Sequence, residues 1–233
     1  MKIKKHKKIY FGIFWTILIV SFIVSATLLI LLANGYYFNF KSLKFQKTGM
    51  IVLRGNSGRA TISVNSKKSI NSLPAKLRRL QPGRYDIKIE KENYQSWERV
   101  FNLEGGQAIV KDNILLFFTN PTVKEKSNNT NDITALQNNF KNGANNIKIN
   151  NNEIWLNDKL ITRYSQPVLG AFLDSDNYHI YVQIGDHIRV IESEGTNDIT
   201  LIKLTGSSPT SFTVSGPKLD YLQNNTIFEA IIR

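Results

Sequence analysis

The chain has 233 residues, which is enough for one or two domains with hydrophobic cores of their own. Aromatic residues make up 11% of it, a share that excludes a wholly disordered protein. The chain has no cysteine, so disulfides, thiol catalysis and thiolate metal sites are excluded. The formal net charge is +12, and five of the positive charges lie within the first eight residues, at Lys2, Lys4, Lys5, Lys7 and Lys8.

Residues 9–33 contain no charged side chain and predict a transmembrane helix. A helix of this length spans about 37 Å, and the hydrocarbon core of a bilayer is roughly 30 Å thick. We expect a retained anchor rather than a cleaved signal peptide, because the apolar part of a signal is only about 7–15 residues long. A helix buried in a soluble core is the other alternative. The lysines before the helix predict a cytoplasmic basic tail at residues 1–8 and an extracytoplasmic location for the rest of the chain.

Residues 41–118 predict a small β-sandwich, with five or six short strands separated by turn residues every eight to twelve positions. Tyr85, Ile87 and Ile89 alternate with polar residues, which is the pattern of a strand with one buried face. Lys67-Lys68 is expected in a turn, and Gln81-Pro82-Gly83 in a tight turn.

The order of motifs in this segment resembles that of a known family. The run Leu80-Gln81-Pro82-Gly83-Arg84-Tyr85 is followed by Tyr94, Trp97 and a Glu104-Gly105-Gly106-Gln107 turn. Residues 49–117 thereby resemble the PEGA domain, a small β-sandwich found in exported and surface-associated prokaryotic proteins. The resemblance implies a membrane-anchored bacterial protein with a binding or scaffolding role, and it brings no catalytic residue to this chain.

Residues 119–146 are rich in asparagine and are expected to form a mobile linker. The spacing of Ile133, Leu136 and Phe140 is compatible with one helical turn.

The β pattern returns in residues 147–233 and contains a partial repeat. Pro167, Phe172, Ile180 and Ile188 have counterparts 42, 40, 39 and 39 residues later, at Pro209, Phe212, Leu219 and Ile227. This spacing is close to the roughly 40–45-residue period of β-propeller blades. A propeller typically has about four to eight blades, so we expect an incomplete, truncated propeller-like region of antiparallel strands.

The candidate binding patch consists of four basic residues: Lys76, Arg78, Arg79 and Arg84. It could hold anionic envelope polymers or lipid headgroups. The alternative is a solvated face without a ligand. Trp97 and Trp155 are either sugar-stacking platforms or, more commonly, buried sandwich residues.

His179 and His187 lie near three aspartates, at 174, 176 and 186, but their spacing matches no metal site. We expect these aspartates to cap turns instead. No catalytic residue, cofactor site or nucleic-acid recognition motif is predicted.

The fold class predicted from these patterns is mainly β, with a transmembrane helix, a PEGA-like sandwich and a propeller-like region. The predicted function is that of a non-enzymatic, single-pass envelope protein that binds or scaffolds. Its expected partners are the lipid bilayer and an envelope polysaccharide, another carbohydrate or another envelope protein. The alternative is the anchored part of an envelope hydrolase whose catalytic region is missing or lies in a complete propeller.

Overall fold

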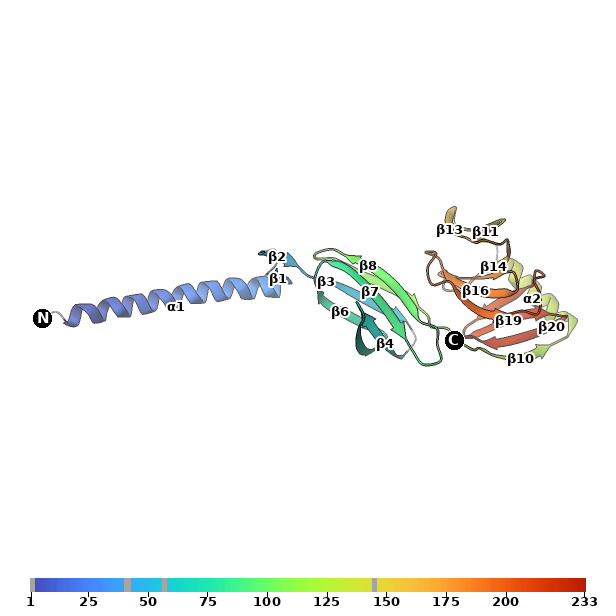
Figure 1. The fold of residues 1–233 in the computed structure, drawn as a ribbon, viewed down its shortest axis with the longest axis horizontal. Helices are drawn as coiled ribbons and strands as arrows, with labels where there is room; N and C mark the ends of the chain where they lie inside the picture. Colours follow the sequence, from blue (N-terminus) through green and yellow to red (C-terminus); the bar gives the residue numbers. More distant parts are fainter. Residues whose placement is uncertain (1–2, 40–42, 56–57, 144–145) are drawn as a thin grey trace. The chain divides into compact units, whose positions relative to one another are not determined.

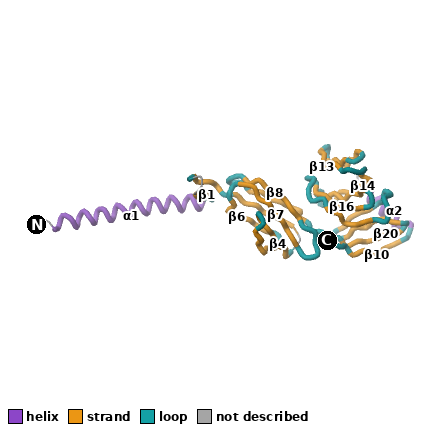
Figure 2. The backbone as a smooth tube through the Cα atoms, viewed as in Figure 1, coloured by secondary structure: helices purple, strands orange, loops and turns teal. Residues whose placement is uncertain are grey.

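The computed structural model describes residues 3–39, 43–55, 58–143 and 146–233, with side chains from residue 11 onward except at 69–71. These residues are mainly in β-strands, with one long helix near the N-terminus and one short helix (Figures 1 and 2). The chain divides into two compact units. The first comprises residues 1–52, 76–85 and 102–110, and the second comprises residues 53–75, 86–101 and 111–233.

Helix α1 (Ile3–Ala33) contains the predicted apolar span. Its residues 11–33 are long and apolar enough to cross a membrane, and none of the most apolar stretch is buried within the chain. This exposure argues against the alternative of a helix buried in a soluble core. The helix begins six residues earlier than predicted, since lysine is a good helix former. Lys2 lies outside the described residues, and the side chains of the other four N-terminal lysines are not described.

A β-hairpin follows α1 almost directly in the first unit. It consists of β1 (Tyr36–Asn39) and β2 (Lys44–Lys47), with only Asn34 and Gly35 between it and the helix. Gly35 ends the helix with a φ of +78°, the left-handed conformation that glycine adopts without strain. Its carbonyl then accepts hydrogen bonds from the backbone N–H of Thr48 at 2.8 Å and from the Thr48 hydroxyl at 2.9 Å. The base of the hairpin is therefore fastened to the end of the helix.

Seven strands follow: β3 (Gly49–Gly55), β4 (Arg59–Val64), β5 (Lys67–Ser72), β6 (Ala75–Leu80), β7 (Gly83–Glu90), β8 (Trp97–Leu103) and β9 (Ala108–Ile114). They form two sheets with strand orders β6-β3-β9 and β5-β4-β7-β8, which confirms the sandwich-like, β-rich prediction. Ile87 and Ile89 are buried, as their alternation predicted.

One strand occupies a segment expected as a turn. Lys67 and Lys68 begin β5, because the chain reverses two residues earlier, at Asn65 and Ser66. These two residues have φ values of +49° and +64°. Positive φ at both central positions is the geometry of a type I′ hairpin turn, which matches the twist of the strands it joins.

The segment 119–146 differs from the mobile linker expected of it. Residues Thr122–Ser127 form strand β10, and Thr130–Gly143 form helix α2. Leu136 is buried, and the ring of Phe140 packs 4.8 Å from that of Phe212. One of the asparagines has a local structural role, because the Asn129 side chain accepts the backbone N–H of Asn131 at the helix start. The polar composition of this segment therefore does not predict its strand and helix.

The remaining strands are β11 (Ile147–Asn150), β12 (Glu153–Leu156), β13 (Lys159–Arg163), β14 (Val168–Leu173), β15 (His179–Ile184), β16 (His187–Glu192), β17 (Ile199–Lys203), β18 (Phe212–Ser215), β19 (Lys218–Gln223) and β20 (Thr226–Ile231). They form antiparallel sheets ordered β11-β12-β13, β14-β15-β16-β17 and β10-β20-β19-β18. In the described residues these are separate sheets, without a closed barrel or propeller.

The sequence repeat corresponds to a structural one. Phe172 and Phe212 lie in β14 and β18, and the later members of the repeat lie in β15 and β19 and in β16 and β20. The fourth strand of each sheet has a different origin. In the first sheet it is β17, which follows β16 along the chain, and in the second it is β10, which comes about a hundred residues before β20. Lys124 of β10 and Lys218 of β19 both contact the buried carboxylate of Glu229, at 3.1 and 3.0 Å.

Candidate functional site

The predicted basic patch is spread over two sheets. Lys76, Arg78 and Arg79 lie on β6, and Arg84 lies on β7 of the other sheet. All four side chains are exposed, and Arg79 has a φ of +56°. No described pocket is lined by these residues, so the patch stays a prediction.

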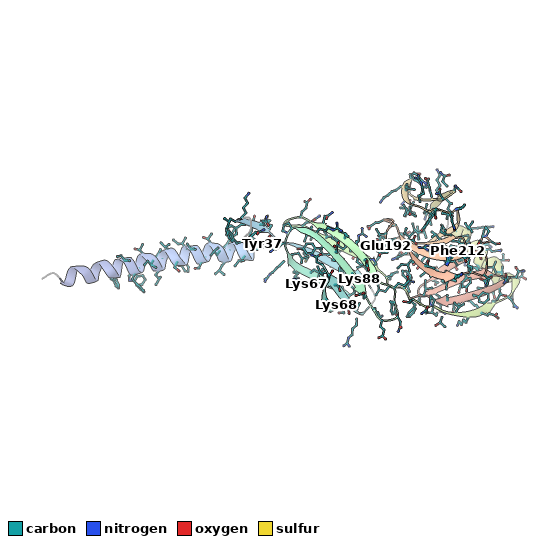
Figure 3. All side chains as sticks on the ribbon, in the orientation of Figure 1. Tyr37, Lys67, Lys68, Lys88, Glu192 and Phe212 are labelled. Atoms are coloured by element: carbon teal, nitrogen blue, oxygen red, sulfur yellow. The ribbon has the colours of Figure 1, made fainter. Side chains whose placement is uncertain are left out.

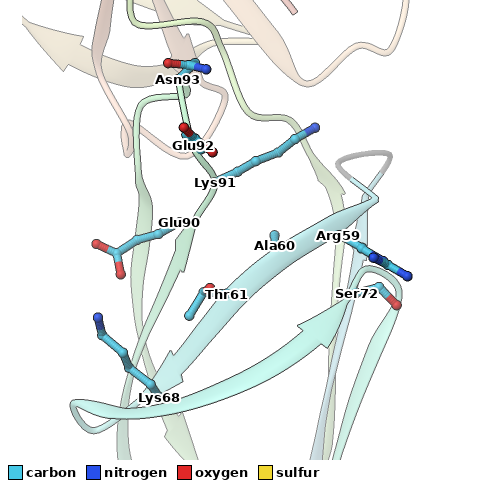
Figure 4. Close-up of a pocket in the computed structure, with 9 residues that line it drawn as sticks. All are labelled: Arg59, Ala60, Thr61, Lys68, Ser72, Glu90, Lys91, Glu92 and Asn93. Atoms are coloured by element: carbon cyan, nitrogen blue, oxygen red, sulfur yellow. The ribbon is translucent and has the colours of Figure 1, made fainter.

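An open groove of about 1140 Å³ lies in the second unit, along β4 and β5 and the turn that follows β7 (Figure 4). Antiparallel pairing sets its outline, because Arg59 is opposite Ser72 in the β4–β5 pair and Thr61 is opposite Glu90 in the β4–β7 pair. Lys68 lies further along the same β5 strand, as Figure 4 shows. We refer to this surface as the Arg59 groove; its lining residues are Arg59, Ala60, Thr61, Lys68, Ser72, Glu90, Lys91, Glu92 and Asn93.

The lining of the Arg59 groove is polar and carries charges of both signs. Arg59, Lys68 and Lys91 supply cations, and Glu90 and Glu92 supply carboxylates. Hydroxyls, an amide and charges of both signs suit ion pairing and hydrogen bonding to an extended polar chain. The groove lacks aromatic side chains among its lining residues, so recognition by sugar stacking is not built into it.

A buried carboxylate organises a second polar site, labelled at Glu192 in Figure 3. The side chain of Glu192 is 2% exposed, at the end of β16. Its Oε1 accepts the indole N–H of Trp97 at 2.6 Å, and its Oε2 accepts the hydroxyl of Tyr178 at 2.6 Å. Thr196 and Asn197 donate to the same carboxylate at 2.8 and 3.2 Å.

Two cations complete the site. Arg99 of β8 and Lys111 of β9 each lie 3.3 Å from Oε2 of Glu192, and both also pair with Glu194. We call the residues around this carboxylate the Glu192 cluster: Trp97, Arg99, Lys111, Tyr178, Glu192, Thr196 and Asn197. Burial lowers the pKa of the Lys111 amine, although the neighbouring Glu192 charge acts in the opposite direction.

The Glu192 cluster joins segments far apart in sequence through charge-assisted hydrogen bonds to one carboxylate. Trp97 and Glu192 are separated by 95 residues. The Glu192 side chain is 2% exposed and its carboxylate bonds to side chains of the second unit, which is the pattern of a structural clamp rather than of an open binding site. Sequence reasoning missed it, because no local motif links Lys111 to Glu192.

The histidine and aspartate residues lie at two different turns, one before β15 and one between β15 and β16. Asp176 accepts the backbone N–H groups of Tyr178 and His179 at 2.8 and 3.0 Å, which confirms the predicted capping role. Burial raises the pKa of the Asp176 carboxyl, but hydrogen bonds from His179 outweigh it, and the net effect is a lowered pKa. His187 instead pairs with Asp186, at 2.7 Å. Among the described residues, no three His, Cys, Asp or Glu side chains come together as a metal site.

Of the two tryptophans, Trp97 is a buried residue of the sandwich, and Trp155 lies in β12, outside it. Trp97 is 1% exposed, and Trp155 is partly buried with its indole N–H bound to Glu153 at 2.9 Å. Neither ring lines a described pocket.

Comparison with known proteins gives a match for one segment of the chain. No curated protein matches the chain. Residues 48–114 match the family model of the PEGA domain, which confirms the resemblance drawn from the sequence motifs.

Proposed function

We propose that this chain is a non-enzymatic, membrane-anchored protein of the cell envelope that binds or scaffolds a polar ligand. The observation that carries the proposal is the Arg59 groove, an open, mixed-charge surface on strands of the PEGA segment. Helix α1 would act as a retained anchor with its lysine-rich end in the cytoplasm, which leaves the β units outside. Charges of both signs favour an envelope polymer or a protein segment that itself carries charged groups.

We also propose that the two four-stranded sheets of the C-terminal region are blade-like. Their strand-for-strand correspondence and four-stranded antiparallel order support this view. In this proposal the blades enlarge the scaffold surface and have no catalytic role.

The test is a binding screen on the full chain in lipid nanodiscs, with peptidoglycan, teichoic acid and a neutral glucan as probes. The variant Arg59→Ser with Lys68→Ser removes two positive charges from the Arg59 groove. The matched control, Arg78→Ser with Arg79→Asn, removes two from the predicted patch; asparagine is used at 79 because it tolerates a positive φ.

Loss of binding in the groove variant alone would support the groove as the site. Loss in the patch variant alone would place the site on β6 instead. Equal weakening of both variants would indicate nonspecific charge attraction, and no binding by the unaltered chain would rule out polymer recognition in favour of protein scaffolding.

A further inference from the structure

The hairpin β1–β2 has an exposed apolar face at the end of the proposed anchor. In its register Tyr36 is opposite Lys47 and Phe38 is opposite Phe45, so these four side chains share one face. The rings of Phe38 and Phe45 lie 5.1 Å apart in an edge-to-face arrangement. Phe45 is 44% exposed and Leu43, next to β2, is 74% exposed. This is a large apolar area for a short hairpin to leave in water.

The charge of the hairpin segment is of one sign. Residues 34–47 contain no aspartate or glutamate and have lysines at 41, 44 and 47. Lys44 and Lys47 are exposed, and the Lys47 amine lies 5.4 Å from the centre of the Tyr36 ring. Lys41 lies outside the described residues. Aromatic rings beside lysines are the composition of segments that lie at the interface of an anionic bilayer.

The opposite face of the hairpin is occupied by its own hydrogen bonds. Tyr37 donates to the Gln46 side chain at 2.6 Å, and Asn39 donates to the same oxygen at 3.2 Å. Lys44 is opposite Asn39 and lies on this polar face, whereas Lys47 lies on the aromatic face. The hairpin is therefore amphipathic, with one lysine on each face.

Chain geometry fixes the depth of the base of this hairpin. Two residues separate α1 from β1, and they span at most about 7 Å. The headgroup layer on each side of a bilayer is roughly 5–8 Å thick. The hydrogen bonds from Thr48 to Gly35 hold the residue that follows β2 at the same place. If α1 spans the bilayer, the hairpin starts and finishes at headgroup depth.

We propose that the β1–β2 hairpin is a second membrane-binding element, with Leu43 and Phe45 inserted among anionic lipid headgroups and Lys44 and Lys47 paired with their phosphates. The proposal rests on the proposed anchoring by α1. In this position the hairpin keeps the first strands of the PEGA segment against the bilayer surface.

The experiment uses single-cysteine labels, which are unique because the chain has no cysteine of its own. A fluorescent dye is attached at Leu43→Cys, at Ser25→Cys within α1, or at Lys159→Cys on exposed β13, in the full chain reconstituted into vesicles of zwitterionic lipid with anionic phosphatidylglycerol. Nitroxide lipids quench the dye from either a shallow or a deep position. Lys44→Cys provides a second hairpin label if Leu43→Cys fails to fold.

We expect the dye at 43 to be quenched by shallow nitroxide, the dye at 25 by deep nitroxide and the dye at 159 by neither. In the 43-labelled chain, Lys44→Gln with Lys47→Gln should lower the equilibrium constant for hairpin insertion on the order of tenfold or more in anionic vesicles.

A quenched label at 25 with unquenched labels at 43 and 44 would overturn the hairpin proposal and leave the anchor intact. An unquenched label at 25 would overturn the anchor, and with it this inference. Quenching at 159 equal to that at 43 would overturn it too, as would burial of the label at 43 by a second copy of the chain in detergent without lipid.

Discussion

The indole N–H of Trp97 donates a 2.6 Å hydrogen bond to the carboxylate of Glu192, although the two residues are 95 positions apart. Both side chains are almost fully buried, so the bond forms away from water. Hydrogen bonds to a buried charge are among the stronger ones in proteins, and an unmade one leaves the charge poorly solvated. The pair thereby fastens β8 to the end of β16.

Replacement of Trp97 by phenylalanine should lower the free energy of unfolding by about 2–3 kcal/mol, because Oε1 of Glu192 loses its shortest donor. Urea unfolding of the full chain in detergent micelles, followed by circular dichroism, measures the change. The control is Trp155→Phe, which removes a similar indole–carboxylate bond at a more exposed place and should cost less than about 1 kcal/mol. Equal losses in the two variants would contradict a special role for Glu192.

Glu192→Gln should be more damaging than Trp97→Phe. Lys111 and Arg99 would lose the buried one of the two carboxylates that they share and would keep only Glu194, which is 41% exposed. Removal of one member of a buried ion pair typically costs about 3–5 kcal/mol. The matched variant Glu194→Gln alters a carboxylate that is 41% exposed and should cost about 1 kcal/mol or less. The same urea titration applies, and a larger loss for Glu194→Gln would refute the assignment of Glu192 as the centre.

Lys111 should make stability depend on alkaline pH. Burial lowers its pKa in the folded chain below the ordinary value of 10.5, so between these two values the unfolded chain binds more protons. The free energy of unfolding of the natural chain should therefore rise with pH in this window, relative to that of Lys111→Met. Urea titrations of both proteins between neutral pH and pH 10.5 give the difference. A constant or falling difference would show that the pKa of Lys111 is not lowered.

Leu136→Ala tests the order of helix α2, which lies in the segment whose composition predicts a linker. The leucine is 5% exposed on α2, so its truncation should cost about 2–5 kcal/mol. Gln137→Ala, one residue along on the exposed side of the same helix, should change stability by less than about 0.5 kcal/mol. Limited proteolysis within residues 130–143 reports the local effect. An unchanged cleavage rate in Leu136→Ala would show that the buried Leu136 side chain does not stabilise the helix.

Strand patterns were the most predictable part of this chain. The local sequences of three strands are sufficient to predict their bounds, which are Trp97–Leu103, Glu153–Leu156 and Val168–Leu173. Each has apolar residues at period two or a short apolar run between turn residues, which is a local signal. The repeat between residues 167–188 and 209–227 was also readable, because equivalent strands bury equivalent apolar residues.

Features that depend on distant partners were not predictable. Strand β10 has five exposed residues and one partly buried one, so its sequence lacks the pattern of a strand; it forms because β20 offers an unpaired edge. The Arg59 groove and the Glu192 cluster share this origin, since their residues meet through register and through segments far apart in sequence. The predicted patch relied on sequence proximity, whereas Arg84 lies in a different sheet from its three companions.

The pairing of β10 with β20 has a consequence for the order of folding. Thr122 pairs with Ile231, so the intervening chain, with α2 and nine strands, lies within a loop closed by one sheet edge. Long-range pairings of this kind form late, since the entropy of closing the loop is lost before the contact is gained. During synthesis β10 must remain unpaired until β20 has emerged. The last sheet is therefore assembled only after translation of this region, and it is the part of the chain most exposed to wrong pairing in the interval.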